Sequence, residues 1–262
     1  ALMTTEIHPS AVVADGAELD EGVSIGPLCV VGPKVKLGKG TRLVSNVTVD
    51  GNTTFGENNE VLPFACIGMI PQDLKYNGEE TALVVGSNNR IREYVTIHLA
   101  SSDGDGETTV GDDNFFMAYV HIAHDCKVGS HIIMANYAGL SGHVVLEDHV
   151  VAGGMLGVHQ FTRIGEYAML GGVSRIIHDV PPYVIASGAD KAKLYGLNLV
   201  GLKRNGFTDE TISELKAAYR ILFREKLPLG DAIKKIQEEV AYSDKVRHLV
   251  EFVQANKRGI CR

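Results

Sequence analysis

The chain has 262 residues, and 45% of them are hydrophobic, as in ordinary globular proteins with one large domain or two smaller ones. A net charge of −7 argues against a nucleic-acid-binding surface, which is normally basic. No apolar run approaches the roughly 20 residues of a membrane helix, the N-terminus lacks signal-peptide features, and the 4 cysteines show no CxxC spacing. We therefore expect a reduced, cytoplasmic protein with no membrane span.

An apolar residue recurs at every sixth position through most of the chain. The register begins at Ile7 and is strictest in one series: Val110, Phe116, Ile122, Val128, Met134, Leu140, Leu146, Ala152, Val158, Ile164, Leu170 and Ile176. A period of six fits neither a helix nor an alternating strand. It fits a triangular coil with three six-residue sides, in which residues eighteen apart stack about 4.8 Å from one another. This pattern predicts a mainly β protein, with a parallel β-helix over residues 1–190.

Two interruptions of the register predict loops that leave the coil, near residues 69–84 and 99–109. The interval from Ile67 to Val85 is eighteen, so we expect the register to survive there, with side chains facing elsewhere. The second segment is rich in Gly, Asp and Ser, which is typical of a loop, and the frame slips by one residue across it. Loops on a rigid scaffold often carry function.

The repeat is expected to end at Pro181 and Pro182, which cannot donate to a ladder of backbone hydrogen bonds. From about Lys191 the apolar spacing becomes helical, with Thr208 as an N-cap. Two further helices are predicted near 229–240 and 244–256. Residues 191–262 are thus predicted to form a C-terminal helical domain that covers the end of the coil.

Spacing also predicts where chemistry could occur. His124, Gly142 and Gln160 are eighteen residues apart, so they should form one column, with His121 and His143 beside it. An imidazole with a pKa near 6.5 can accept a proton at neutral pH. Spacing alone leaves a structural role open for each of these residues.

Seven motifs in order carry a resemblance that covers essentially the whole chain. They are PQDLKY (71–76), IREYVTIH (91–98), HIAHDC (121–126), GHV (142–144), VHQF (158–161), DVPPYVIASG (179–188) and GLNLVGLKRNGF (196–207). With the six-residue repeat they resemble the UDP-N-acetylglucosamine acyltransferases of lipid A biosynthesis, a family of the hexapeptide-repeat superfamily. The resemblance implies a left-handed parallel β-helix and a homotrimer with sites between subunits. It further implies transfer of a 3-hydroxyacyl chain from acyl carrier protein to the 3-hydroxyl of UDP-N-acetylglucosamine, without a metal or organic cofactor.

The resemblance also implies roles for individual residues. His124 would be the general base, Asp125 would orient its imidazole, and the Gly142 N–H would stabilise the oxyanion. Gly172 would leave the acyl groove open and so favour a longer chain, of about fourteen carbons. The implied substrate-binding residues are Gln72, Asp73, Lys75, His98, His121, His143, His159, Gln160, Asn198 and Arg204. The basic residues that could meet an acidic carrier protein are Arg163, Arg175, Lys191 and Lys193.

The chain departs from the family pattern at Leu99–Ala100, Val200 and Asn205, around the expected sugar-nucleotide site. A 3-amino UDP-sugar, acylated to an amide, is therefore an alternative acceptor. Other hypotheses are a γ-class carbonic anhydrase, which would bind zinc through three histidines, a non-catalytic scaffold, and an acyltransferase acting later in the same pathway.

Overall fold

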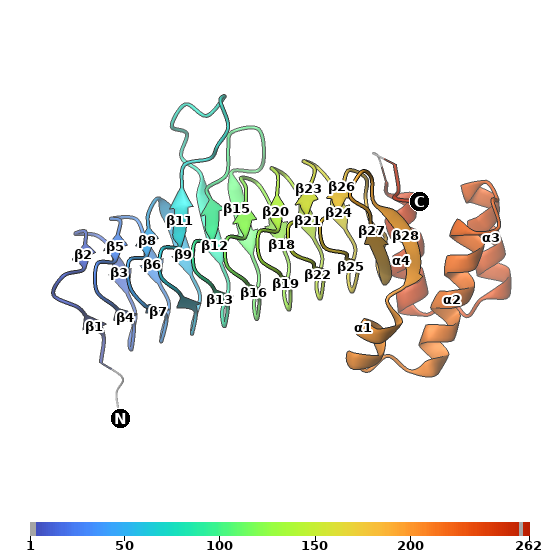
Figure 1. Ribbon diagram of the computed structural model, residues 1–262, viewed down its shortest axis with the longest axis horizontal. Coiled ribbons are helices and arrows are strands. Elements are labelled where there is room, and N and C mark those ends of the chain that lie inside the picture. Colours follow the sequence, from blue (N-terminus) through green and yellow to red (C-terminus); the bar gives the residue numbers. More distant parts are fainter. Residues whose placement is uncertain (1–3, 257–258) are drawn as a thin grey trace.

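A computed structural model describes residues 4–256 and 259–262, so the outer end of the first predicted domain and residues 257–258 of the second lie outside the described residues. The chain winds into a long coil of short strands, followed by four helices (Figure 1). Strands three places apart in the sequence pair in parallel, so the coil has three flat sheets. The mainly β fold and the parallel β-helix are confirmed.

The first sheet contains β1 (Glu6–Ile7), β4 (Ser24–Ile25), β7 (Arg42–Leu43), β10 (Glu60–Val61), β13 (Arg90–Ile91), β16 (Phe115–Phe116), β19 (Ile133–Met134), β22 (Val151–Ala152), β25 (Met169–Leu170), β27 (Val184–Ser187) and β28 (Lys193–Leu197). The second sheet contains β2 (Val12–Val13), β5 (Val30–Val31), β8 (Thr48–Val49), β11 (Cys66–Met69), β14 (Thr96–His98), β17 (His121–Ile122), β20 (Gly139–Leu140), β23 (Gly157–Val158) and β26 (Arg175–Ile176). The third sheet contains β3 (Glu18–Leu19), β6 (Lys36–Leu37), β9 (Asn52–Phe55), β12 (Ala82–Val85), β15 (Glu107–Val110), β18 (Lys127–Val128), β21 (Val145–Leu146) and β24 (Arg163–Ile164).

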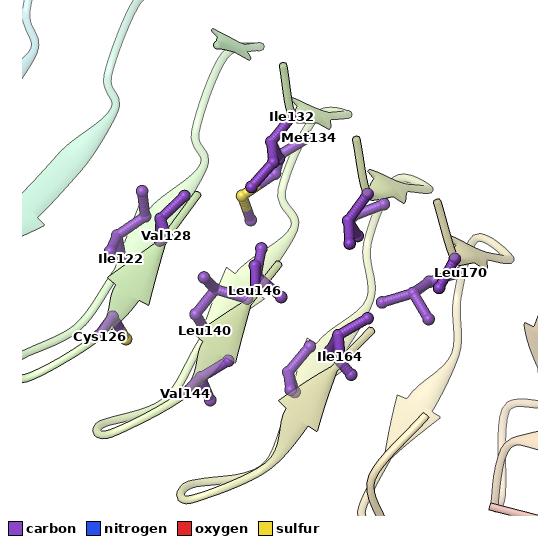
Figure 2. Close-up of a cluster of buried hydrophobic side chains, with 14 of the residues drawn as sticks. Ile122, Cys126, Val128, Ile132, Met134, Leu140, Val144, Leu146, Ile164 and Leu170 are labelled. Carbon is purple, nitrogen blue, oxygen red and sulfur yellow. The ribbon is translucent and has the colours of Figure 1, made fainter. Parts of the chain in front are cut away.

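The six-residue register is the packing rule of the core. Phe116 pairs with Met134 and Ile122 with Leu140, eighteen residues on, and all four are buried. Figure 2 shows such side chains pointing inward from successive coils. The first coil is the exception, because it lies at the open N-terminal end: 48% of the Ile7 surface is exposed, and Val13 and Leu19 are only partly buried. Burial of one apolar side chain on each side of the coils beyond the first supplies the main stabilising free energy.

The turns between the sheets are named here by their position. The first corner lies between the first and second sheets, the second corner between the second and third, and the third corner between the third and first. Each corner of the central coils places a non-glycine residue at positive φ, as at Tyr119, Asp125 and His131. These left-handed residues let the chain turn within a few positions.

Both predicted loops leave the coil at the second corner, and Figure 1 shows them projecting from the same side. Val61 pairs with Ile91, thirty residues on rather than eighteen, so twelve residues leave the coil between β11 and β12. Twelve residues are two full periods, so the six-residue register survives across this loop as expected, although the stacking interval grows from eighteen to thirty. Ile91 pairs with Phe116, twenty-five residues on, so seven more leave between β14 and β15.

The C-terminal part differs from the prediction at two points. The ladder does not end at the two prolines, because β27 still pairs in parallel with β25 through Leu170 and Ala186. The segment predicted to be helical from Lys191 begins instead with β28, which runs antiparallel to β27.

The helices follow as α1 (Leu199–Arg204), α2 (Asp209–Phe223), α3 (Leu229–Glu239) and α4 (Asp244–Gln254). Thr208 is confirmed as the N-cap of α2, since its hydroxyl accepts a hydrogen bond from the Thr211 N–H. None of the described helices is long and apolar enough to cross a membrane. A domain boundary at residue 190 stays a prediction.

Candidate active site

Four histidines gather around the second corner: His98, His121, His124 and His143. His121 is the outward residue of β17, and its Nδ1 lies 2.7 Å from Thr96 Oγ1 on the preceding coil. The buried His98 ring meets His121 edge-on, with 5.0 Å between centroids. Burial, with a smaller effect of neighbouring histidines, lowers the pKa of His98 to about 4 and also lowers the pKa of His121. Both imidazoles are therefore largely neutral at pH 7.

His124 lies next in this group, and its partner is the residue that follows it. His124 Nδ1 lies 2.8 Å from Asp125 Oδ2. Only 2% of the Asp125 side chain is exposed, so water competes little for this hydrogen bond. A carboxylate can only accept, so Nδ1 donates and Nε2 is left as the proton acceptor of the ring. This is the arrangement that a general base requires.

Gly142 lies directly against the His124 ring from the next coil. A Cβ added at Gly142 would lie 2.4 Å from His124 Cε1 and 2.6 Å from Nε2, so only glycine leaves the ring in place. Phe161 N–H in turn bonds Gly142 C=O at 3.1 Å, which confirms the predicted stacking of His124, Gly142 and Gln160. Within the described part of the chain, the Gly142 N–H has no hydrogen-bond acceptor. It is therefore available to a negatively charged oxygen beside His124.

An open cavity of about 480 Å³ lies over these groups, lined by His121, His124, Gly142, Gln72 and Gln160 among others. The cavity has this depth because two of its lining residues are glycines. Gly139 and Gly157 occupy the outward position that corresponds to His121 in the next two coils, and they carry no side chain. A Cβ at either glycine would meet no atom within 4 Å, so backbone packing does not demand glycine there. Their effect is to leave space for a ligand beside the imidazoles.

The hypothesis of a zinc site can be compared with the same corner. Among the described residues, His124, Asp125 and His143 form the group whose ligand atoms all lie within 4.8 Å of one another. His143 Nε2 is 3.8 Å from Asp125 Oδ2, and its ring stacks on Phe161 with 4.4 Å between centroids. This set contains two histidines and a carboxylate, whereas the carbonic-anhydrase hypothesis requires three histidines. The Asp125 oxygen is already hydrogen-bonded to His124.

Comparison with known proteins agrees with this geometry. A family model for the second domain of UDP-N-acetylglucosamine O-acyltransferase matches residues 179–261, and one for the bacterial transferase hexapeptide matches residues 107–142. The acyl-[acyl-carrier-protein]–UDP-N-acetylglucosamine O-acyltransferase of Thermodesulfovibrio yellowstonii is 58% identical over 257 residues, which are 98% of this chain and 99% of that protein. The chain belongs to this acyltransferase family.

Solved structures of the family have the same fold. LpxA from Acinetobacter baumannii is 44% identical, with a TM-score of 0.94, over 98% of this chain and 99% of its own. UDP-N-acetylglucosamine O-acyltransferase (LpxA) from Moraxella catarrhalis is 43% identical, with a TM-score of 0.93 and the same coverage. The β-helix is thus the left-handed one that the resemblance implied.

Several residues that the family resemblance implied do not line this cavity in the single chain. Asp73 Oδ1 accepts a hydrogen bond from the Lys75 N–H at 3.0 Å within the first loop. Lys75 Nζ lies 3.1 Å from Asp103 in the second loop, and this carboxylate raises the lysine pKa. His159 lines an adjoining pocket with Arg175. Their binding roles stay predictions.

Three further predicted residues lie on other parts of the fold. Asn198 is the buried N-cap of α1, where its Oδ1 accepts from Gly201 N–H and its Nδ2 donates to Tyr167 C=O. Arg204 is exposed at the end of the same helix. Gly172 lies at the first corner, where a Cβ would approach Gly154 C=O to 3.2 Å. Gly172 does not have positive φ, so the left-handed turn itself does not require a glycine there.

The sequence reasoning missed the residues that hold the histidines and Asp125. Thr96 bonds His121, Thr108 Oγ1 accepts from the Asp125 N–H at 2.8 Å, and Ser101 bonds the Asp125 carboxylate. Thr96 could have been found, because it precedes the register residue Ile97 as His121 precedes Ile122. Ser101 carries no such signal, because it lies in the second loop, outside the repeat.

Proposed function

We propose that this chain transfers a 3-hydroxyacyl group from acyl carrier protein to the 3-hydroxyl of UDP-N-acetylglucosamine, the first step of lipid A biosynthesis. The observation that carries the proposal is the His124–Asp125 pair in an open cavity beside Gly142, whose N–H has no acceptor among the described residues. A relative with 58% identity over nearly its whole length bears the name of this activity.

The proposed reaction follows from the atoms at this corner. His124 Nε2 takes the proton of the sugar 3-hydroxyl, whose oxygen attacks the thioester carbonyl carbon. The carbonyl oxygen becomes an oxyanion that accepts a hydrogen bond from the Gly142 N–H, and Asp125 stabilises the imidazolium. The C–S bond then breaks, the thiolate leaves with the proton from His124, and an ester remains. No step needs a metal or an organic cofactor.

We further propose that the active unit is a homotrimer with sites between subunits. Large side chains that stack along the first corner are exposed by 44 to 64%: Phe64, Tyr94, Tyr119, Tyr137, Met155 and Val173. An apolar stripe of this length is a surface that a second copy would cover. Gly172 lies beside this stripe, so a neighbouring copy can bring it to the His124 cavity as the proposed acyl ruler. Asn198 and Arg204 would reach the nucleotide in the same way.

The carrier protein would approach the basic residues at the end of the coil. Arg175, Lys191 and Lys193 are exposed, and Arg175 lines the pocket that adjoins the His124 cavity. Arg163, which was also predicted to take part, is engaged instead with Glu147 and stacks over Phe252. We place the reaction in the cytoplasm, where the four free thiols would stay reduced.

A transfer assay tests the activity directly. UDP-N-acetylglucosamine is incubated with carrier proteins bearing 3-hydroxyacyl chains of ten to sixteen carbons, and the native chain is compared with His124→Ala. We expect transfer by the native chain, the highest rate with about fourteen carbons, and a loss of at least about 10³-fold in the variant. Undiminished transfer by His124→Ala would refute the assigned base.

Three further measurements separate the remaining parts of the proposal. Transfer to the 3-amino UDP-sugar but not to UDP-N-acetylglucosamine would replace the ester by an amide. Light scattering should give three times the chain mass, and Tyr119→Glu should dissociate the assembly. Activity that persists after chelation is expected, and activity that returns only with added zinc would contradict the metal-free mechanism.

A further inference from the structure

The Asp125 carboxylate is held by the second loop as well as by its own coil. Ser101 donates two hydrogen bonds to Asp125 Oδ2, from its N–H at 3.0 Å and its hydroxyl at 2.7 Å. Both residues are buried, with 1% of Ser101 and 4% of Asp125 exposed. The oxygen that receives the His124 Nδ1–H thus also receives both polar groups of Ser101.

The other carboxylate oxygen is enclosed by the same loop. Within the described residues, Asp125 Oδ1 is buried and has no hydrogen-bond partner. A Cβ added at Gly104 would lie 2.2 Å from this oxygen, so the loop backbone packs directly against it. Among the described residues, the three hydrogen bonds of this side chain therefore converge on Oδ2, and a rotation of the carboxylate would break them together.

We propose that Ser101 is a positioning residue for the acyl transfer, which fixes the Asp125 carboxylate so that it holds the His124 ring in its base tautomer. The proposal rests on the function proposed above, in which His124 is the base. Ser101 does not line the His124 cavity, so it acts through Asp125 and not on the substrate. A carboxylate with fixed Oδ2 keeps Nε2 of His124 aimed at one point, as general-base catalysis requires.

The contact also explains why the chain diverts seven residues from the coil at this place. A regular turn would carry the backbone from β14 straight to β15, with no residue able to fold back over the second corner of the next coil. The loop is tied at its outer part by Asp103 to Lys75 of the first loop, at 3.1 Å, and by Asp105 to Lys127, at 2.9 Å. These ion pairs are exposed, so the buried Ser101–Asp125 contact is the firmer anchor.

The test compares Ser101→Ala with Ser101→Thr in the full chain under the transfer assay. Ser101→Ala removes the hydroxyl bond and should lower kcat roughly tenfold with little change in KM, because the substrate is not contacted. Ser101→Thr keeps the hydroxyl and should restore kcat to within about threefold. Ser102→Ala is the matched control, since Ser102 is the exposed neighbour in the same loop, and it should retain native kinetics.

A double-mutant cycle separates positioning from a general loss of structure. In an Asp125→Asn background, Ser101→Ala should cause less than a twofold further loss, because the residue through which it acts is already impaired. Native kcat in Ser101→Ala, or the same tenfold loss in both backgrounds, would overturn the proposal. If His124→Ala retained activity, the proposed function, with His124 as the base, would be refuted, and the role of Ser101 with it. A loss in His124→Ala with native Ser101→Ala would refute only the role of Ser101.

Discussion

Gly142→Ala adds one carbon directly against the candidate base. The new Cβ would lie 2.4 Å from His124 Cε1, whereas ordinary carbon contacts begin near 3.5 Å, so the ring must retreat by about 1 Å. A displacement of this size at reacting groups lowers the rate about 10²-fold. The variant keeps the backbone N–H, and Gly142 does not have positive φ, so the change isolates the position of the ring.

The assay is acyl transfer at saturating substrate, beside thermal unfolding of each variant. Gly129→Ala is the matched control, because its Cβ would lie 2.4 Å from Asp148 Oδ1, at the third corner of the coil. It should lower stability comparably and keep native kcat. If Gly142→Ala retained native kcat while the His124 resonances stayed unshifted, the ring would not be confined as the structure indicates, and the reasoning would be refuted.

Three further predictions concern the cavity and two titrating histidines. Gly157→Leu should fill the cavity and lower kcat/KM at least tenfold, with the Tm unchanged because the added Cβ meets no atom within 4 Å. The pKa of His98 is about 4 in the folded chain and about 6.5 when unfolded, so the free energy of unfolding should fall by about 3 kcal/mol between pH 6.5 and pH 4. The hydrogen bond to Glu147, at 2.7 Å, raises the pKa of His248, so its stabilisation is complete below pH 6.5 and is lost as pH rises through the folded pKa.

Each of these predictions has its own control. Gly230→Leu places the same side chain on an exposed helix and should leave kcat/KM native. In urea titrations at several pH values, the free energy of unfolding of His98→Asn should not fall between pH 6.5 and pH 4. If it fell as much as in the native chain, a group other than His98 would be responsible. Glu147→Gln should abolish the decline in stability above pH 6.5, because it removes the carboxylate that raises the pKa of His248. A decline of native size in Glu147→Gln would exclude this contact as its source.

The parts of the fold that repeat were readable from the residues alone. One inward apolar residue in six, with eighteen residues to a coil, dictates which strands pair and which side chains stack. His124, Gly142 and Gln160 could therefore be placed in one column before any coordinates. The interval of eighteen predicts contacts only while the chain stays in the coil. It fails at both loops, although the six-residue frame survives the twelve-residue loop and shifts by one residue only at the seven-residue loop.

The spacing of apolar residues predicted the wrong secondary structure where pairing with a neighbouring strand determined the conformation. Leu194 and Leu197 are three residues apart, as on a helix, yet they lie in β28 because the edge left open by β27 pairs with that segment. Asn198 matches a binding motif, but in the chain its side chain caps α1 and bonds Tyr167.

The amino-acid sequence by itself determined the coil, its register and the column that holds the candidate base, because each depends on short intervals repeated many times. Only the tertiary structure decided how that base is held. Ser101 meets Asp125 across twenty-four residues of chain, through a loop whose path is set by its own contacts and not by the period. A contact of this kind depends on backbone geometry at a single place, so it cannot be predicted from a repeat in the sequence.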